Sequence, residues 1–167
     1  MRRVSLVLGG ARSGKSRFAE SLASRTPGPR RYIATAEAFD DEMRERISLH
    51  RHQRGVGWDT VEAPLDLAAA LAAPGAGFVL VDCITIWLNN LICHERDVAA
   101  AVAGLCAVLP DIAGDVVLVS NEVGLGIVPG NALARRFRDA QGLANQRLAA
   151  MADEVYFIAA GLPLRLK

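Results

Sequence analysis

The chain has 167 residues, of which 51% are hydrophobic and 22% are charged. This length and composition are typical of one soluble globular domain, residues 1–167, with a sizeable core. Nineteen Lys and Arg against eighteen Asp and Glu leave a net charge of +1, which argues against a broad nucleic-acid surface and leaves only local anion binding.

Targeting segments and cysteines give little information about function. No apolar stretch approaches the roughly 20 residues of a membrane span, and the apolar run at residues 4–8 is too short for a secretory signal. We therefore expect a cytoplasmic protein with no membrane span. Cys83, Cys93 and Cys106 form no C-x-x-C pair, so they are interpreted as reduced, mostly buried thiols and not as metal ligands.

Short apolar runs alternate with helical stretches along the chain. The predicted strands are residues 4–8, 31–34, 78–81, 116–120 and 155–158, with 58–62 as a weaker candidate and 164–167 as a candidate antiparallel edge strand. The predicted helices are residues 15–24, 41–54, 65–72, 84–92, 98–109 and 132–151. Continuous apolar strands between helices are typical of a mostly parallel sheet with helices on both faces, which binds its ligand beyond the carboxyl ends of the strands.

The first predicted strand runs into GGARSGKS, residues 9–16, which matches the phosphate-loop pattern G-x-x-x-x-G-K-[ST]. The glycines permit a tight turn whose N–H groups face phosphate oxygens together with the helix N-terminus. Lys15 is expected to reach the β- and γ-phosphates, and the Ser16 hydroxyl is expected to ligate Mg²⁺. The alternative is a glycine-rich turn that fits the pattern by chance. The predicted fold class is an α/β P-loop NTPase domain.

The strand at residues 78–81 ends at Asp82. A carboxylate in this place is suited to the metal or its water shell, and the alternative is an Asp that caps the helix beginning at Ile84. The N-K-x-D sequence with which Ras-like GTPases read guanine occurs nowhere in the chain. Its absence argues against a regulatory GTPase.

The predicted helix at residues 41–54 places Arg46, His50 and Arg54 on one face, because they are spaced four residues apart. Two guanidiniums bind phosphate oxygens well, and their charge favours the neutral imidazole that can attack phosphorus. His52 lies on another side of the helix. The residues alone leave open a solvated basic helix.

Four blocks of the chain, residues 9–16, 32–36, 41–62 and 120–147, follow one another in order. Together they resemble the bifunctional adenosylcobinamide kinase / adenosylcobinamide-phosphate guanylyltransferase family of cobalamin biosynthesis. The resemblance implies a RecA-like P-loop sheet and a homotrimer. The histidine helix and the N-E-V-G-x-G-I-V-P loop are its specific parts, since the phosphate loop is common to many proteins.

The resemblance implies two reactions. In the first, ATP or GTP phosphorylates the hydroxyl of the aminopropanol arm of adenosylcobinamide. In the second, GTP gives its GMP to an enzyme histidine with release of pyrophosphate, and the GMP passes to adenosylcobinamide phosphate to form adenosylcobinamide-GDP. The family's R-I-x-x-H stretch selects His50 over His52 as the guanylylated residue. A covalent intermediate splits one difficult transfer into two easier ones.

Site residues are carried over by position. His50 and Lys15 are expected to be catalytic, and Ser16 and Asp82 are expected to hold Mg²⁺, although some family members carry Glu in place of this aspartate. The nucleotide contacts implied for GTP or ATP are Gly9, Gly10, Ala11, Arg12, Ser13, Gly14, Lys15, Ser16, Ala34, Thr35, Ala36, Arg51, His52, Gln53, Arg54, Glu62 and Asp82.

Two other functions stay open at this point. One is a plain small-molecule P-loop kinase in which His50 is a surface residue, and the other is a nucleotide-binding module without transfer chemistry. Residues 122–131 hold three glycines and a proline between a strand and a helix. They are either a mobile substrate loop, and then the first candidate for the corrinoid surface, or a structural turn.

Overall fold

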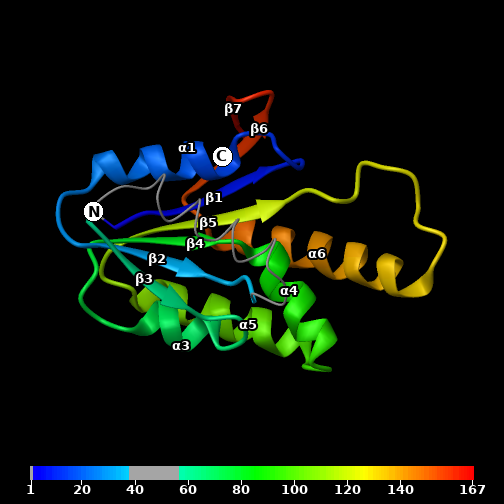
Figure 1. Cartoon of the computed structure of the whole chain (residues 1–167). Coiled ribbons are helices and arrows are strands. Elements are labelled where there is room, and N and C mark those ends of the chain that lie inside the picture. Colours follow the sequence, from blue (N-terminus) through cyan, green and yellow to red (C-terminus); the bar gives the residue numbers. More distant parts are fainter. Residues whose placement is uncertain (1, 38–56) are drawn as a thin grey trace.

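A computed structural model describes residues 2–37 and 57–167 (Figure 1). Within these residues, seven strands form one sheet in the order β3-β2-β4-β5-β1-β6-β7. Their bounds are β1 Val4–Gly9, β2 Arg30–Ala34, β3 Trp58–Glu62, β4 Phe78–Asp82, β5 Asp115–Asn121, β6 Glu154–Ala159 and β7 Leu162–Arg165. Every pairing is parallel except that of β6 with β7. The predicted mostly parallel sheet is confirmed, including the weaker strand candidate β3.

The C-terminal strand begins and ends two residues earlier than predicted. The strand expected at residues 164–167 lies at Leu162–Arg165. Ala160 and Gly161, with φ of 50° and 79°, connect it to β6, which is the signature of a tight two-residue hairpin turn. Pro163 is tolerated inside β7 because an edge strand need not donate every backbone hydrogen bond.

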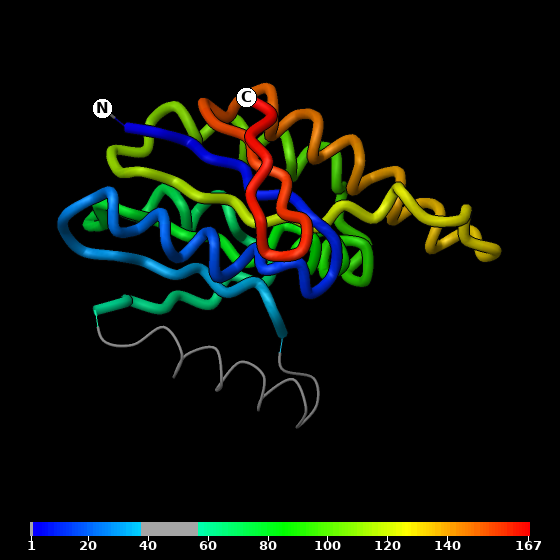
Figure 2. Tube along the Cα trace, turned by 90° about the horizontal axis from the view of Figure 1, so that it is seen from above, coloured from blue at the N-terminus to red at the C-terminus, as the bar shows by residue number. Residues whose placement is uncertain are grey.

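Helices cover both faces of the sheet (Figures 1 and 2). Their bounds are α1 Lys15–Leu22, α3 Leu67–Ala72, α4 Ile84–Cys93, α5 Val98–Val108 and α6 Ala132–Met151, with 3-10 turns at Ala23–Arg25 and Leu109–Asp111. α3 begins two residues later than predicted, with Asp66 at the N-cap position. The helix predicted at 41–54 lies outside the described residues. No helix in residues 2–37 and 57–167 has the length and apolarity to cross a membrane.

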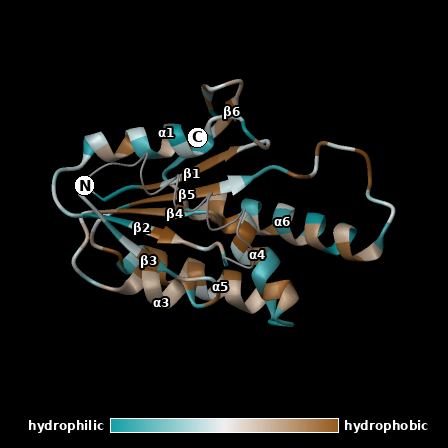
Figure 3. Cartoon of the chain, in the orientation of Figure 1, coloured by the Kyte–Doolittle hydropathy of each residue, from teal (hydrophilic) through white to brown (hydrophobic). Residues whose placement is uncertain are grey.

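Alternate residues of each central strand face two different apolar layers. In β1, Val4, Leu6 and Leu8 pack into the layer of α3, α4, α5 and α6, whereas Val7 packs into the layer of α1. Both faces of these strands are therefore buried, which explains why they read as continuous apolar runs in the sequence (Figure 3).

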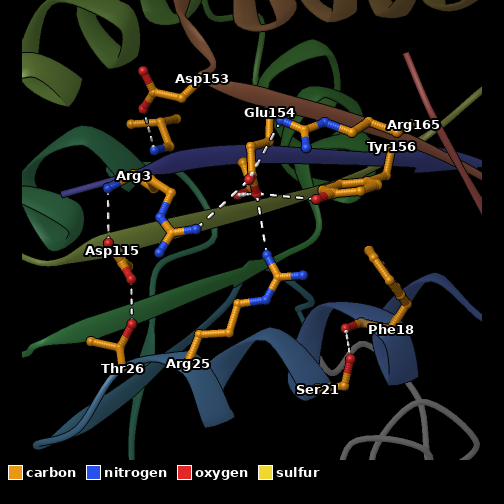
Figure 4. A network of polar contacts seen from close by, with 12 residues as sticks. Arg3, Phe18, Ser21, Arg25, Thr26, Asp115, Asp153, Glu154, Tyr156 and Arg165 are labelled. Atoms are coloured by element: carbon orange, nitrogen blue, oxygen red, sulfur yellow. Dashed lines mark hydrogen bonds and ion pairs between the residues drawn. The ribbon is translucent and has the colours of Figure 1, made fainter. Parts of the chain in front are cut away.

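A buried carboxylate ties together the amino ends of β1 and β6 (Figure 4). Glu154 lies 3.3 Å from Arg25, 3.7 Å from Arg165 and 3.8 Å from Arg3, and it accepts a hydrogen bond from the Tyr156 hydroxyl at 3.2 Å. Pairing with guanidiniums offsets the cost of burying the charge. Arg25 follows α1, so the cluster fastens the end of that helix to the sheet.

The central strand β5 predicts a stability effect. Leu118 is fully buried, so Leu118→Ala is expected to lower the free energy of unfolding by about 2–5 kcal/mol, because the cavity adds to the lost transfer energy. Leu162→Ala in the edge strand is the matched control, since that side chain is 72% exposed, and it should change stability by less than about 0.5 kcal/mol. Urea denaturation measures both, and equal losses would contradict the assigned core.

Candidate active site

The carboxyl ends of the strands bring distant residues to one edge of the sheet. Ala34 at the end of β2 is paired with Glu62 on β3 and with Asp82 on β4. Gly9 at the end of β1 is paired with Asn121 on β5. Because β5 lies between β1 and β4, the phosphate loop and Asp82 flank one central strand, in the region where open α/β sheets bind ligands.

Close backbone packing explains two glycines of the phosphate loop. A Cβ on Gly9 would lie 2.5 Å from the carbonyl oxygen of Ile158, and one on Gly14 would lie 3.2 Å from the Cα of Gly161. Gly14 also has a φ of 98° at the N-cap of α1, a conformation that glycine adopts without strain. The N–H of Gly161 donates to the Ser13 carbonyl at 2.8 Å, so the β6–β7 turn supports the loop.

Lys15 is buried beneath this loop. Its ammonium donates to the Gly10 carbonyl and lies 3.5 Å from the Ser13 hydroxyl. Burial lowers the pKa of Lys15, and the nearby Cys83 and Asp82 oppose that shift. A phosphate anion also favours the charged ammonium, so the arrangement is suited to the β- and γ-phosphates of a nucleotide.

Two hydroxyls converge on Asp82. The Ser16 hydroxyl donates to Oδ2 at 2.8 Å, and the Tyr32 hydroxyl donates to the same oxygen at 3.1 Å. The serine and aspartate are 66 residues apart in the sequence and belong to α1 and β4. Mg²⁺ prefers oxygen ligands and is held by few protein side chains together with substrate phosphates. The donor set at this point therefore fits Mg²⁺.

Thr35 has a structural role that the sequence does not reveal. Its hydroxyl accepts a hydrogen bond from the Cys83 N–H and donates to the Cys83 carbonyl, both at 2.8 Å. The Asn90 side chain donates to the Thr35 carbonyl at 2.8 Å. The buried threonine thus fixes the backbone directly after Asp82. Its predicted contact with the nucleotide stays a prediction.

The loop between β5 and α6 starts at the phosphate site. The N–H of Glu122 donates to the Gly9 carbonyl at 3.0 Å, and the side chain of Asn145 donates to the Asn121 carbonyl at 3.1 Å. From there the loop extends away from the sheet (Figures 1 and 2). It exposes apolar side chains, with Ile127 98% accessible and Leu125 83% accessible.

The structure brings several of the predicted site residues to one end of the sheet, and their contacts with a nucleotide stay predictions. The phosphate loop, Ala34, Glu62 and Asp82 all reach the carboxyl edge, and Ala36 follows β2. The residues outside the described part of the chain are His50, Arg51, His52, Gln53 and Arg54. Sequence reasoning missed Tyr32. A signal existed, because a tyrosine inside a buried apolar strand needs a partner for its hydroxyl.

A family model described as cobinamide kinase / cobinamide phosphate guanyltransferase matches residues 5–166. The chain belongs to this family. It is 46% identical over 166 residues to the bifunctional adenosylcobalamin biosynthesis protein CobP of Pseudomonas aeruginosa, covering 97% of this chain and 96% of that one. It is 42% identical to the protein CobU of Salmonella typhimurium, covering 97% and 98%.

The fold of this cobinamide kinase family member also occurs in more distant proteins. The KaiC-like protein PH0186 of Pyrococcus horikoshii superimposes with a TM-score of 0.52 at 16% identity, covering 93% of this chain and 70% of that one. At this identity the likeness shows the fold alone. It agrees with the predicted P-loop α/β class.

Thiol chemistry in this family member is expected to differ between two positions. Burial and the neighbouring Asp82 raise the pKa of Cys83 to about 11, so its thiol stays protonated at lower pH. At pH 8, iodoacetamide should therefore alkylate the exposed Cys93 and leave Cys83 unmodified in the folded protein. Peptide mass spectrometry measures both sites. Equal alkylation in the native state, and not only after denaturation, would contradict the buried placement of Cys83.

Proposed function

We propose that the chain phosphorylates adenosylcobinamide with ATP or GTP and then transfers GMP from GTP to adenosylcobinamide phosphate. The products of the second step are adenosylcobinamide-GDP and pyrophosphate. Membership of the cobinamide kinase / cobinamide phosphate guanyltransferase family supports both reactions. The observation that carries the proposal is the direct contact of Ser16 with Asp82 beside the buried Lys15, since these groups suit a triphosphate and its metal.

In the kinase step, the loop N–H groups and Lys15 bind the β- and γ-phosphates and hold them in line with the substrate hydroxyl. Ser16 and Asp82 would hold the Mg²⁺ of the nucleotide. When bound, Mg²⁺ neutralises charge that develops on the phosphate oxygens. The hydroxyl oxygen forms a bond to the γ-phosphorus and gives up its proton to solvent, the bond from that phosphorus to the bridging oxygen breaks, and the nucleoside diphosphate leaves.

In the guanylyltransferase step, His50 is the proposed nucleophile. Its neutral nitrogen forms a bond to the α-phosphorus of GTP, and the bond from that phosphorus to the bridging oxygen breaks, so that pyrophosphate leaves. A phosphate oxygen of adenosylcobinamide phosphate then displaces the histidine. This assignment rests on the family resemblance, as do the nucleotide contacts of Arg51, His52, Gln53 and Arg54.

The loop at residues 122–131 is the proposed corrinoid-facing segment. It begins beside the phosphate loop, with the hydrogen bond from Glu122 to Gly9, and from there it extends away from the sheet (Figures 1 and 2). Leu125, Ile127 and Val128 are exposed on it, and apolar side chains of this kind suit the methyl groups and the ring surface of a corrin, whose rim otherwise carries polar amide side chains. The homotrimer and the cytoplasmic location stay predictions.

The deciding experiment distinguishes transfer of the α-phosphate of GTP to the protein from transfer of its γ-phosphate. The protein is incubated with Mg²⁺ and GTP labelled at the α-phosphate, with γ-labelled GTP in parallel. We expect acid-labile, alkali-stable label from the α-position only, since phosphoramidates of histidine have that stability. His50→Ala should abolish the label. His94→Ala is the matched control and should retain it, because His94, the C-cap of α4, lies outside the R-I-x-x-H stretch and its ring pairs with Glu37 at 3.4 Å.

The other outcomes select the alternatives. If His52→Ala loses the label and His50→Ala keeps it, the choice of nucleophile is wrong. If no α-label stays on the wild-type protein while the γ-phosphate reaches adenosylcobinamide, the protein is a plain small-molecule kinase. If nucleotide binds and neither transfer occurs, the protein is a nucleotide-binding module.

A further inference from the structure

The carboxylate of Asp82 is held differently from the buried carboxylate at the other edge of the sheet. Glu154 is surrounded by guanidiniums, which neutralise it. Asp82 instead accepts hydrogen bonds from the hydroxyls of Ser16 and Tyr32, and the Lys15 ammonium acts on it as a nearby charge. The two hydroxyl donors orient the carboxylate without pairing its charge.

The Tyr32 ring is fixed before any ligand binds. It is buried in the layer of α1, and it packs edge to face against Trp58, with ring centroids 6.3 Å apart. Trp58 packs in the same way against Phe78, at 5.9 Å. Aromatic pairs of this geometry restrict the ring. The hydroxyl at its tip consequently has a defined position relative to β4.

We propose that Tyr32 is a positioning residue, whose hydroxyl holds the Asp82 carboxylate in the orientation that receives the nucleotide's Mg²⁺. Ser16 and Tyr32 approach the same oxygen, Oδ2, from α1 and from β2. Two donors from different elements fix the rotation of the carboxylate. The protein, and not the metal, then sets the direction in which the second oxygen, Oδ1, points. The inference rests on the metal role proposed above for Asp82.

The test uses Tyr32→Phe in the full chain, because phenylalanine keeps the ring and removes only the hydroxyl. Loss of a hydrogen bond to a metal-ligating carboxylate typically weakens metal binding about 10- to 100-fold. We expect the Mg²⁺ concentration for half-maximal stimulation of GTP binding to rise about tenfold, near the lower limit of that range, since Ser16 remains. Calorimetric titration with GTP at graded Mg²⁺ gives this value, and the affinity for GTP in EDTA should change by less than about twofold because the loop contacts remain.

Tyr156→Phe is the matched control. Its hydroxyl also donates to a buried carboxylate, that of Glu154, at 3.2 Å (Figure 4), against 3.1 Å for Tyr32 to Asp82. Both substitutions remove one phenol-to-carboxylate hydrogen bond from the same apolar layer. Both should lower the melting temperature, whereas only Tyr32→Phe should shift the Mg²⁺ dependence. A shift that is absent, or equal in the two variants, overturns the inference and leaves Tyr32 a packing residue.

Asp82→Asn separates failure of the inference from failure of the metal assignment. The amide keeps the shape of the side chain and removes its charge. If Asp82→Asn abolishes the Mg²⁺ dependence and Tyr32→Phe leaves it unchanged, the metal site stands and the positioning role is wrong. If Asp82→Asn itself leaves the Mg²⁺ dependence unchanged, the metal assignment fails and the inference fails with it.

Discussion

The hydrogen bond from Ser16 to Asp82 is the contact on which the rest of the site depends. It joins the first turn of α1 to the end of β4 across the width of β5. For this bond to form, α1 must lie over the sheet on the side to which Asp82 points. The apolar layer of α1, with Ala19 and Leu22 fully packed, sets that placement. The packing of these apolar side chains therefore sets the distance between the Ser16 hydroxyl and the Asp82 carboxylate.

The two edges of the sheet handle buried charge in opposite ways. At the amino edge, Glu154 is satisfied by three arginines and a tyrosine, and the cluster is complete within the protein. At the carboxyl edge, Lys15 is buried against a carbonyl and a hydroxyl, and Asp82 is oriented by hydroxyls. The hydrogen-bond partners of this lysine and this aspartate are uncharged groups, so an anion can still pair with the first and a cation with the second. A metal-bound triphosphate supplies both.

Much of the framework was predictable because its signals are local. The strands that are buried on both faces appear as uninterrupted apolar runs, and the spacing of glycines before Lys15 identifies the phosphate loop. The errors lie where local signals compete. The start of β7 was missed because it holds Pro163, which an edge strand tolerates, and α3 begins two residues later than predicted, after Asp66. The contact of Thr35 with the nucleotide stays a prediction, and the bonds of its hydroxyl to Cys83 are a further role that no local signal indicated.

The sequence by itself determined the fold class, the phosphate loop and the family, because each depends on the order and spacing of residues along the chain. Only the tertiary structure decided which side chains meet. Strand order places β5 between β1 and β4, and parallel register then sets Ala34 beside Asp82. Tyr32 reaches Asp82 across 50 residues of sequence. No local pattern encodes that contact, since it exists only after β2 and β4 have paired.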